Sequence, residues 1–311
     1  MILPPLARIR LRLTAPLGTR LVSGTLFGHV CWALREAEGA ASLQAWLAAQ
    51  DAAPTIFSDG FPEGLLPRPS LAPPPPRIPQ GQADADAAKA RARRPWIRAA
   101  DLAALRLRLD PVFLADKLVD SPWHGADTID AVRVAHGPVD ASTARGRDAA
   151  GFVVEEDWSF KIAPWRDVYV RSVETPARLA ALLGAVGETG YGRSASWGRG
   201  RFVVDSIVAA PELDGADGAR WLSLSHGTID AAMRDARYRL VTHSGRLGAA
   251  ASGDCTRPWK HAILLAEPGA TFAATGAGPF GALLAGVHPG AEAVRHDARH
   301  VAIRYGEVVH P

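Results

Sequence analysis

The segment Gly190–Phe202 reads GYGRSASWGRGRF, with four glycines in two G-x-G pairs, three arginines and no acidic residue. A helix is predicted directly before it, because Thr175-Pro176 supplies a capping residue followed by proline at the first helical position. Gly187 is expected to end this helix. Its apolar residues recur at helical spacing: Leu179, Leu182, Leu183 and Val186. The alternating run RFVVDSIVA, residues 201–209, predicts a strand directly after the segment.

The N-terminal region supplies the elements that this helix and strand need as partners. Residues 7–13 alternate between apolar side chains and arginines, which predicts a strand with one buried face. Residues 26–37 have helical apolar spacing, with Ser23 or Thr25 as the expected cap and Gly39 at the end. A short helix is predicted from Ser42. Further strand-like runs occur at 151–154 and 167–173.

This order of elements is that of a ferredoxin-like β-α-β-β-α-β domain. We therefore predict an α+β protein with such a domain at residues 1–210. Residues 211–311 have strand candidates at 221–225, 238–242, 262–266 and 301–305. They predict a smaller, β-rich C-terminal domain, which we interpret as a degenerate ferredoxin-like unit.

An insertion at residues 67–108 interrupts the first domain. Its first part is rich in proline, which supports neither a helix nor a central strand, so an exposed loop is expected up to residue 95. Its second part is basic, with one acidic residue, Asp101, against seven bases: Lys89, Arg91, Arg93, Arg94, Arg98, Arg106 and Arg108. Two interpretations are open: a solvated loop, or an arm that folds onto RNA or a partner protein.

Composition excludes several classes of protein. With 48% hydrophobic and 22% charged residues in a chain of 311, a sizeable core is expected. The two cysteines are too few for a disulfide scaffold or a cysteine-rich zinc site. Neither a signal peptide nor a membrane-spanning run is recognised, so we predict a cytoplasmic protein without a membrane partner. The net charge of +3 does not by itself indicate a polyanion as ligand.

The glycine-rich loop, as we call Gly190–Phe202, admits three interpretations. Glycines allow inward-pointing amides that bind anions, arginines suit phosphate oxygens, and aromatic rings stack on bases, which together favour RNA. A glycine-rich surface turn with incidental arginines is the plain alternative. The loop also satisfies the dinucleotide pattern G-x-G-x-x-A, but it follows a helix and precedes a strand, the reverse of the order that such sites need.

Four segments, in order, resemble the RAMP (repeat-associated mysterious protein) superfamily of CRISPR effector subunits. Residues 23–31, SGTLFGHVC, resemble the family's S-x-T-L-F start of the first helix. Residues 57–69 contain SDGFP and LPRP, which resemble its S-D-x-F-P…L-P-[KR]-P segment. The glycine-rich loop is the third. Trp259-Lys260 with EPGATF at 267–272 resembles the C-terminal pattern. Within the superfamily the likeness is greatest to subunit four of the type III-A Csm complex.

The resemblance implies a non-catalytic subunit that holds the 5′ handle of the CRISPR RNA. It implies as partners the large polymerase/nuclease-like subunit and the backbone RAMP subunit, with target RNA met indirectly. We expect no cofactor and no metal. The chain departs from the family at 139–143, where its arginine is missing and Arg145 or Arg147 would have to replace it, and at 242–245.

The candidate RNA-binding residues come from the loop and three other places. Phosphates are expected to be held by amides and hydroxyls of the loop, at Gly190, Gly192, Ser194, Ser196, Gly198 and Gly200, and by Arg193, Arg199 and Arg201. Tyr191 and Trp197 are expected to stack on bases. Ser23 and Thr25 would add donors at the first helix. Arg68 and Lys260 are secondary candidates.

Two rival functions stay open. His29 could act as the general base of a metal-independent endoribonuclease, although its apolar surroundings favour a structural histidine. Alternatively, the chain is a protein-only scaffold whose basic loops bind acidic partners. His296 and His300 are spaced as two metal ligands on one helix face would be, but the segment lacks the glutamate of zincins.

Overall fold

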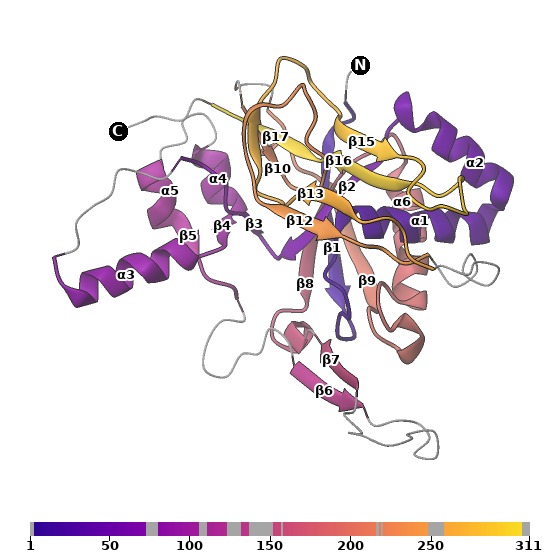
Figure 1. The fold of residues 1–311 in the computed structure, drawn as a ribbon, viewed down its shortest axis with the longest axis horizontal. Helices are drawn as coiled ribbons and strands as arrows, with labels where there is room; N and C mark the ends of the chain where they lie inside the picture. The colour runs from indigo at the N-terminus through magenta and orange to yellow at the C-terminus, as the bar shows by residue number, and fades with distance from the viewer. Residues whose placement is uncertain are drawn as a thin grey trace.

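The structure, a computed structural model, describes residues 3–72, 80–105, 111–122, 132–136, 152–156, 158–215, 218, 220–247 and 258–306. Its first sheet consists of β1 (Leu6–Leu13), β2 (Ile56–Pro62), β8 (Trp165–Arg171) and β9 (Phe202–Ala209) in the order β2-β8-β1-β9 (Figure 1). All its pairs are antiparallel. This is the ferredoxin-like order, with the connections made by α1 (Ser23–Glu38) and α6 (Pro176–Thr189).

The apolar periodicity predicted these elements because it marks the sides that enter one core. Alternate residues of β1 (Ile9, Leu11, Leu13) pack with the apolar stripes of α1 and α6. α2 (Ala40–Ala48) extends this core through Trp46, whose ring stacks on Phe27 at 5.3 Å between centroids. Each large apolar side chain fully buried here contributes about 1.5–3 kcal/mol to folding.

The end of α6 and the start of α1 differ from the prediction. Thr175 does cap α6, accepting a hydrogen bond from the Arg178 amide at 3.3 Å. α6 does not end at Gly187 but continues to Thr189, and Gly190 with φ 96° terminates it. Neither Ser23 nor Thr25 caps α1, whose N-cap is Val22. The carboxylate of a distant residue, Asp59, takes that place, as described below.

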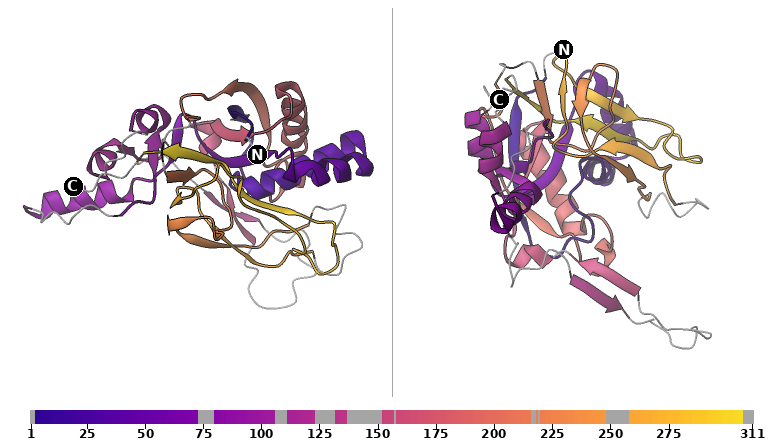
Figure 2. Two further views of the ribbon diagram at one scale, coloured as in Figure 1. Left: turned by 90° about the horizontal axis from the view of Figure 1, so that it is seen from above. Right: turned by 60° about the vertical axis from the view of Figure 1, so that its left-hand side comes forward.

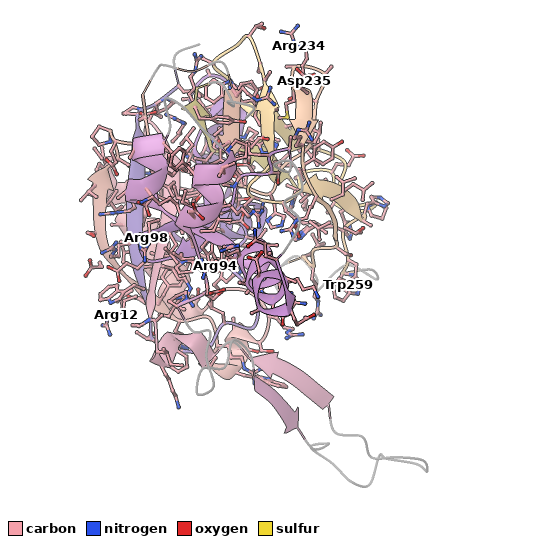
Figure 3. All side chains as sticks on the ribbon, turned by 90° about the vertical axis from the view of Figure 1, so that its left-hand side faces the viewer. Arg12, Arg94, Arg98, Arg234, Asp235 and Trp259 are labelled. Carbon is pink, nitrogen blue, oxygen red and sulfur yellow. The ribbon has the colours of Figure 1, made fainter. Side chains whose placement is uncertain are left out.

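The insertion contains regular structure where a loop was expected. β3 (Leu65–Pro67), β4 (Trp96–Arg98) and β5 (Leu118–Val119) form a three-stranded sheet, with α4 (Ala99–Leu105) and α5 (Pro111–Lys117) beside it. Arg98, labelled in Figure 3, is exposed on β4, and its charge is partly balanced by Asp101, 3.7 Å away. Residues 73–79, Arg106 and Arg108 lie outside the described residues.

The segment Gln82–Arg93 was predicted as loop and is instead helix α3, which projects from the body of the molecule (Figure 1). None of its residues is buried, so no core position marked it in the sequence. Its alanines, lysine and arginines are strong helix formers. Asp84 in the first turn and two arginines in the last also complement the helix dipole. Local propensity therefore favours this helix without any buried position, and Arg68 adds a hydrogen bond to its Ala92 carbonyl.

The second half of the chain, residues 211–306, is β-rich as predicted. β10 (Arg220–Ser223), β11 (Arg234–Arg237), β14 (Thr271–Ala273) and β17 (Ala302–Tyr305) form a sheet in the order β11-β14-β10-β17. Two hairpins accompany it: β12 (Leu240–His243) with β13 (Ile263–Ala266), and β15 (Phe280–Leu284) with β16 (His296–His300). Its described residues form no helix. A further hairpin in the first half, β6 (Val132–His136) with β7 (Phe152–Glu156), extends away from both sheets (Figure 2).

The two halves are joined by a common core. Leu6, Ile56 and Tyr169 of the first sheet pack in one buried cluster with residues of the second sheet and the insertion: Leu222, Ile303, Leu66 and Ile97. At the same junction the guanidinium of Arg171 donates to Asp214 at 2.6 Å and to the Pro4 carbonyl at 2.9 Å. The shared core fixes the second half against the first, so a site built from both has a defined geometry.

Gly187 shows how closely α6 and β9 approach. A Cβ added at Gly187 would lie 2.1 Å from the Phe202 carbonyl oxygen, whereas one added at Gly184 on the same helix would meet nothing within 4 Å. We predict that Gly187→Ala destabilises the protein by about 1–3 kcal/mol through overpacking. Gly184→Ala should be neutral or stabilising by up to about 1 kcal/mol. Urea unfolding of the two variants measures the difference; equal stabilities would contradict the packing described.

Candidate nucleic-acid interface

The glycine-rich loop folds back tightly on itself between α6 and β9. Its four glycines, Gly190, Gly192, Gly198 and Gly200, all have positive φ, between 70° and 96°. At Gly200 a Cβ would lie 2.0 Å from the Tyr191 carbonyl oxygen, so no other residue fits there. The sequence correctly marked this loop as one that needs glycine. At Gly190 and Gly200 the missing side chain allows main chain to approach main chain, at Gly192 it makes room for the Thr19 side chain, and at Gly198 a Cβ would meet nothing within 4 Å.

Most amides of the loop are used inside the protein. Gly192 N–H donates to His29 Nε2 at 3.0 Å, Arg193 N–H to Thr19 Oγ1 at 3.0 Å, and Gly200 N–H to the Pro16 carbonyl at 2.8 Å. The amides of Gly190, Tyr191 and Gly198 also donate to carbonyls of the protein. The amides of Gly192, Arg193 and Gly200 hold the loop against α1 and the β1–α1 connection, and the other three bond to α6 or to the loop itself, so none of the six turns toward a phosphate as predicted.

Tyr191 is another correction. It was predicted to stack on a base, but it is fully buried, and its ring lies 5.0 Å from that of His29. Its hydroxyl accepts a hydrogen bond from Val22 N–H and donates to the Arg20 carbonyl, both at 2.9 Å. Burial raises the pKa of this hydroxyl, which keeps it a donor. Tyr191 thus fixes the loop to the start of α1.

The solvent-facing side of the loop carries the remaining candidates. Trp197 is 64% exposed, and Arg193, Ser196 and Arg201 are exposed as well. The Arg201 guanidinium donates to the Glu188 carbonyl at the end of α6. Arg199 is instead buried, with its guanidinium carbon 5.6 Å from the centre of the Trp197 ring. The structure therefore separates an inner Arg199 from an outer surface of arginine and tryptophan.

His29 lies behind the loop. Its Nε2 accepts the Gly192 amide proton, and burial lowers its pKa from 6.5 to about 4. The lone pair that a general base would use is thereby engaged in a main-chain hydrogen bond. This arrangement is that of a structural histidine, the role that the sequence favoured.

Of the two candidates at the start of α1, Ser23 has its donors already bonded within the protein. Ser23 is buried, and its hydroxyl donates to the His226 carbonyl of the second half at 3.2 Å. Asp59 from β2 accepts the Ser23 amide proton at 3.1 Å and binds Nδ1 of His226 at 2.6 Å. The phosphate role predicted for Ser23 is wrong, since a carboxylate and the second half already occupy its donors. Thr25 is half-buried.

The secondary candidates lie in different places. Arg68 belongs to the insertion, where its Nη1 donates to the Ala92 carbonyl at 2.6 Å; burial, and then nearby Arg239, lower its pKa. Lys260 lies in the second half beside exposed Trp259 (Figure 3), and its Nζ donates to the Arg295 carbonyl at 3.3 Å. The structure thus places Arg68 with the insertion and Lys260 with the histidines of the second half, described below.

A metal site at His296 and His300 receives no support. The two residues lie on strand β16, not on a helix, and both are buried. Both nitrogens of His300 already have partners, the Ser223 hydroxyl at 2.6 Å and the Thr228 carbonyl at 3.0 Å. Within the described residues no group of three or more His, Cys, Asp or Glu side chains could hold a metal ion. The same part of the chain has no helix long and apolar enough to cross a membrane.

Solved structures similar to this chain include complexes that contain Csm4. A Csm1-Csm4 cassette in complex with cA3 matches with a TM-score of 0.57 and 14% identity, over 99% of this chain and 100% of that chain. The cassette in complex with pppApA gives 0.59 and 15% over the same shares. A Csm3-Csm4 subcomplex of the type III-A interference complex gives 0.59 and 11%, over 97% and 100%. No protein-family profile and no curated protein matches the chain.

Csm4 is the component named in all three of these structures. The chain therefore shares, over 97–99% of its length, the α+β fold seen in these Csm4-containing structures. This confirms the fold that the four sequence segments implied.

Sequence reasoning did not identify Asp59, His226 or His243 as residues of interest. Asp59 lies in the SDGFP segment, so the family resemblance marked its position, but nothing in the sequence paired it with His226, 167 residues away. His243 lies in the segment 242–245, noted only as a departure from the family. Their common location follows from the docking of the two halves.

Tyr191 provides a test of the inner side of the loop. We predict that Tyr191→Phe costs about 1–3 kcal/mol, because Val22 N–H and the Arg20 carbonyl each lose a partner near the core. Denaturant unfolding measures the loss. Tyr238→Phe is the control, since Tyr238 is 39% exposed; equal stabilities of the two variants would contradict the role given to Tyr191.

The lowered pKa of His29 predicts how the stability of the protein depends on pH. Its folded pKa of about 4 lies below 6.5, so the unfolded chain binds the proton more readily. The contribution of His29 is therefore fully present above pH 6.5 and is lost as the pH falls toward 4. His29→Gln, whose amide oxygen can still accept the Gly192 proton, should weaken this loss between pH 7 and pH 5 in urea unfolding. An unchanged pH dependence would indicate that His29 is already charged in the folded protein.

Proposed function

We propose that the chain is an RNA-binding, non-catalytic subunit of a type III CRISPR effector complex, and that it holds the 5′ handle of the guide RNA. The observation that carries the proposal is the outer surface of the glycine-rich loop. There Arg193, Trp197 and Arg201 face solvent on a loop whose inner side is fixed to α1 and the β1–α1 connection.

This surface suits single-stranded RNA. Guanidinium groups bind phosphates, and an exposed indole offers a face on which any base can stack. Because Tyr191 and the loop amides are bound internally, the surface is held in place before RNA arrives, which reduces the entropy lost on binding. The proposal that the chain holds the RNA handle rests on the family resemblance found in the sequence. The Csm4-like fold agrees with that resemblance and so supports RNA binding over a protein-only scaffold.

For partners we propose a large polymerase/nuclease-like subunit and a backbone RAMP subunit, which the chain would bridge. The similar structures combine Csm4 with Csm1 in the cassettes and with Csm3 in the subcomplex. The endoribonuclease alternative, with His29 as its base, is disfavoured because His29 Nε2 accepts a main-chain hydrogen bond and its pKa is low.

The test is RNA affinity against salt for the double variant Arg193→Ala/Arg201→Ala. A fluorescent handle RNA is titrated between about 50 and 200 mM salt. Each lost phosphate contact should flatten the logarithmic salt slope by roughly 0.7 for single-stranded RNA. Trp197→Ala should weaken binding by about 1–3 kcal/mol at an unchanged slope.

The matched control is Arg234→Ala/Arg237→Ala, two exposed arginines on β11 of the second sheet (Arg234 in Figure 3). It should leave affinity and slope unchanged. If the loop variant behaves like this control, the RNA-binding role of the loop is rejected. Cleavage of repeat RNA by the wild-type chain that His29→Ala abolishes would instead favour the endoribonuclease. A purified complex without RNA would favour the scaffold.

A further inference from the structure

The N-terminus of α1 is in direct contact with side chains of the second half. A Cβ added at Gly24, in the first turn of α1, would lie 2.6 Å from the Asp297 carbonyl oxygen and 2.7 Å from Nε2 of His296. The missing side chain at Gly24 is therefore what allows the imidazole of His296 to reach the end of the helix.

This helix end has donors to offer. α1 is 16 residues long and has no acidic residue in its first turn. Asp59 accepts the Ser23 amide proton, but among the described residues no acceptor is found for the amides of Gly24 and Thr25. Unpaired amides at the start of a helix carry partial positive charge and attract anions.

His296 is a second and independent sign of a ligand. It is 2% exposed, yet its Nε2 has no hydrogen-bond partner within the described part of the chain. A buried polar atom without a partner costs about 1–3 kcal/mol and calls for an explanation. On the same strand, both ring nitrogens of His300 have hydrogen-bond partners. The strand itself is therefore not the reason why His296 Nε2 lacks one.

A second imidazole and a lysine lie near the same place. The His243 ring lies 4.9 Å from the His296 ring. A Cβ at Gly245 would lie 3.2 Å from His243 Nε2 and 3.5 Å from Lys260 Cδ, so these two side chains flank one glycine. Asp59 and Asp297, the carboxylates near this place, are each held by a cationic partner, His226 at 2.6 Å and Arg299 at 2.7 Å.

We propose that the first turn of α1, together with His296, His243 and Lys260, binds a phosphate group, and that this phosphate belongs to single-stranded RNA crossing the junction between the two halves. The amides of Gly24 and Thr25 and the imidazole nitrogens would donate to its oxygens, and Lys260 would supply a point charge. The choice of RNA as ligand rests on the proposed function, whereas the existence of the anion site does not.

The position favours RNA over a free nucleotide. Tyr191 of the glycine-rich loop binds Val22 N–H and the Arg20 carbonyl, which immediately precede Gly24. The loop is therefore anchored to residues directly before the first turn of α1. Under the proposed function, an RNA strand held by the loop would meet the end of α1 as its neighbour.

Binding at this site should take up protons. Burial first, then the nearby charges of Lys260, His243 and His226, lower the pKa of His296 to about 3; burial also lowers the pKa values of His243 and Lys260. A bound phosphate favours their protonated forms, so affinity should rise as the pH falls. The other titratable or charged groups facing this place are Cys31, Asp59, His226, Asp297 and Arg299.

The experiment follows the imidazole nitrogens of the ¹⁵N-labelled full chain by NMR. Inorganic phosphate is added in one arm and handle RNA in the other. Both should shift the His296 and His243 nitrogens and raise their apparent pKa values. In binding assays, His243→Ala/Lys260→Ala should weaken RNA binding about tenfold and flatten its increase between pH 8 and pH 6. His261→Ala, an exposed histidine beside Lys260, is the control and should change neither.

Several results would overturn the inference. If neither probe shifts His296 or His243, the anion site does not exist. If phosphate shifts them and RNA does not, the site serves a small phosphate ligand and the RNA assignment is wrong. His296→Gln tests the buried residue, and His243→Ala, at a half-buried position, serves if that variant does not fold.

The outcome is separable from that of the proposed function. If Arg193→Ala/Arg201→Ala loses RNA binding while His243→Ala/Lys260→Ala keeps it at both pH values, the loop function stands and this inference fails. If the loop variant keeps RNA binding while the second variant loses it, the site is supported and the role of the loop fails.

Discussion

The arrangement of this protein depends on one buried carboxylate. Asp59, 6% exposed on β2, accepts hydrogen bonds from the Ser23 amide, the His226 amide and the His226 imidazole. Burial lowers the pKa of His226, but Asp59 and Glu267 together raise it more, so the pKa lies above its ordinary value. Removing one partner of a buried pair of this kind costs about 3–5 kcal/mol in other proteins. This one side chain thus ties the start of α1 to the second half.

The same connection between β1 and α1 organises the glycine-rich loop. Tyr191, His29 and Thr19 hold the loop from the inside, so that its main chain has little freedom left. Positive φ at the glycines allows this close approach. The thirteen residues of the loop therefore have two roles. The glycines and Tyr191 serve the fold, while Arg193, Trp197 and Arg201 remain at the surface, where the proposed ligand would bind.

Under the proposed function, both halves would contact the RNA, and both are positioned by the same part of the structure. The loop surface belongs to the first half, and the histidines and Lys260 belong to the second. They come together because Leu6, Ile56, Leu222 and Ile303 share one core. Under the proposed function, the recognition of RNA and the docking of the halves are not independent properties, since both need the start of α1 in one place.

The sequence by itself determined the elements whose signal is local. Period-two alternation in residues 7–13, helical spacing before Gly39, and the Thr175-Pro176 start predicted β1, α1 and α6, and the order of elements predicted the ferredoxin-like sheet. Only the tertiary structure decided which loop residues turn inward, that Asp59 takes the place of a local cap, and that His296 reaches Gly24 with His243 beside it. The reason is physical: periodicity reports the side of an element that is buried, whereas hydrogen bonds and close contacts between residues far apart in sequence exist only after the elements have packed.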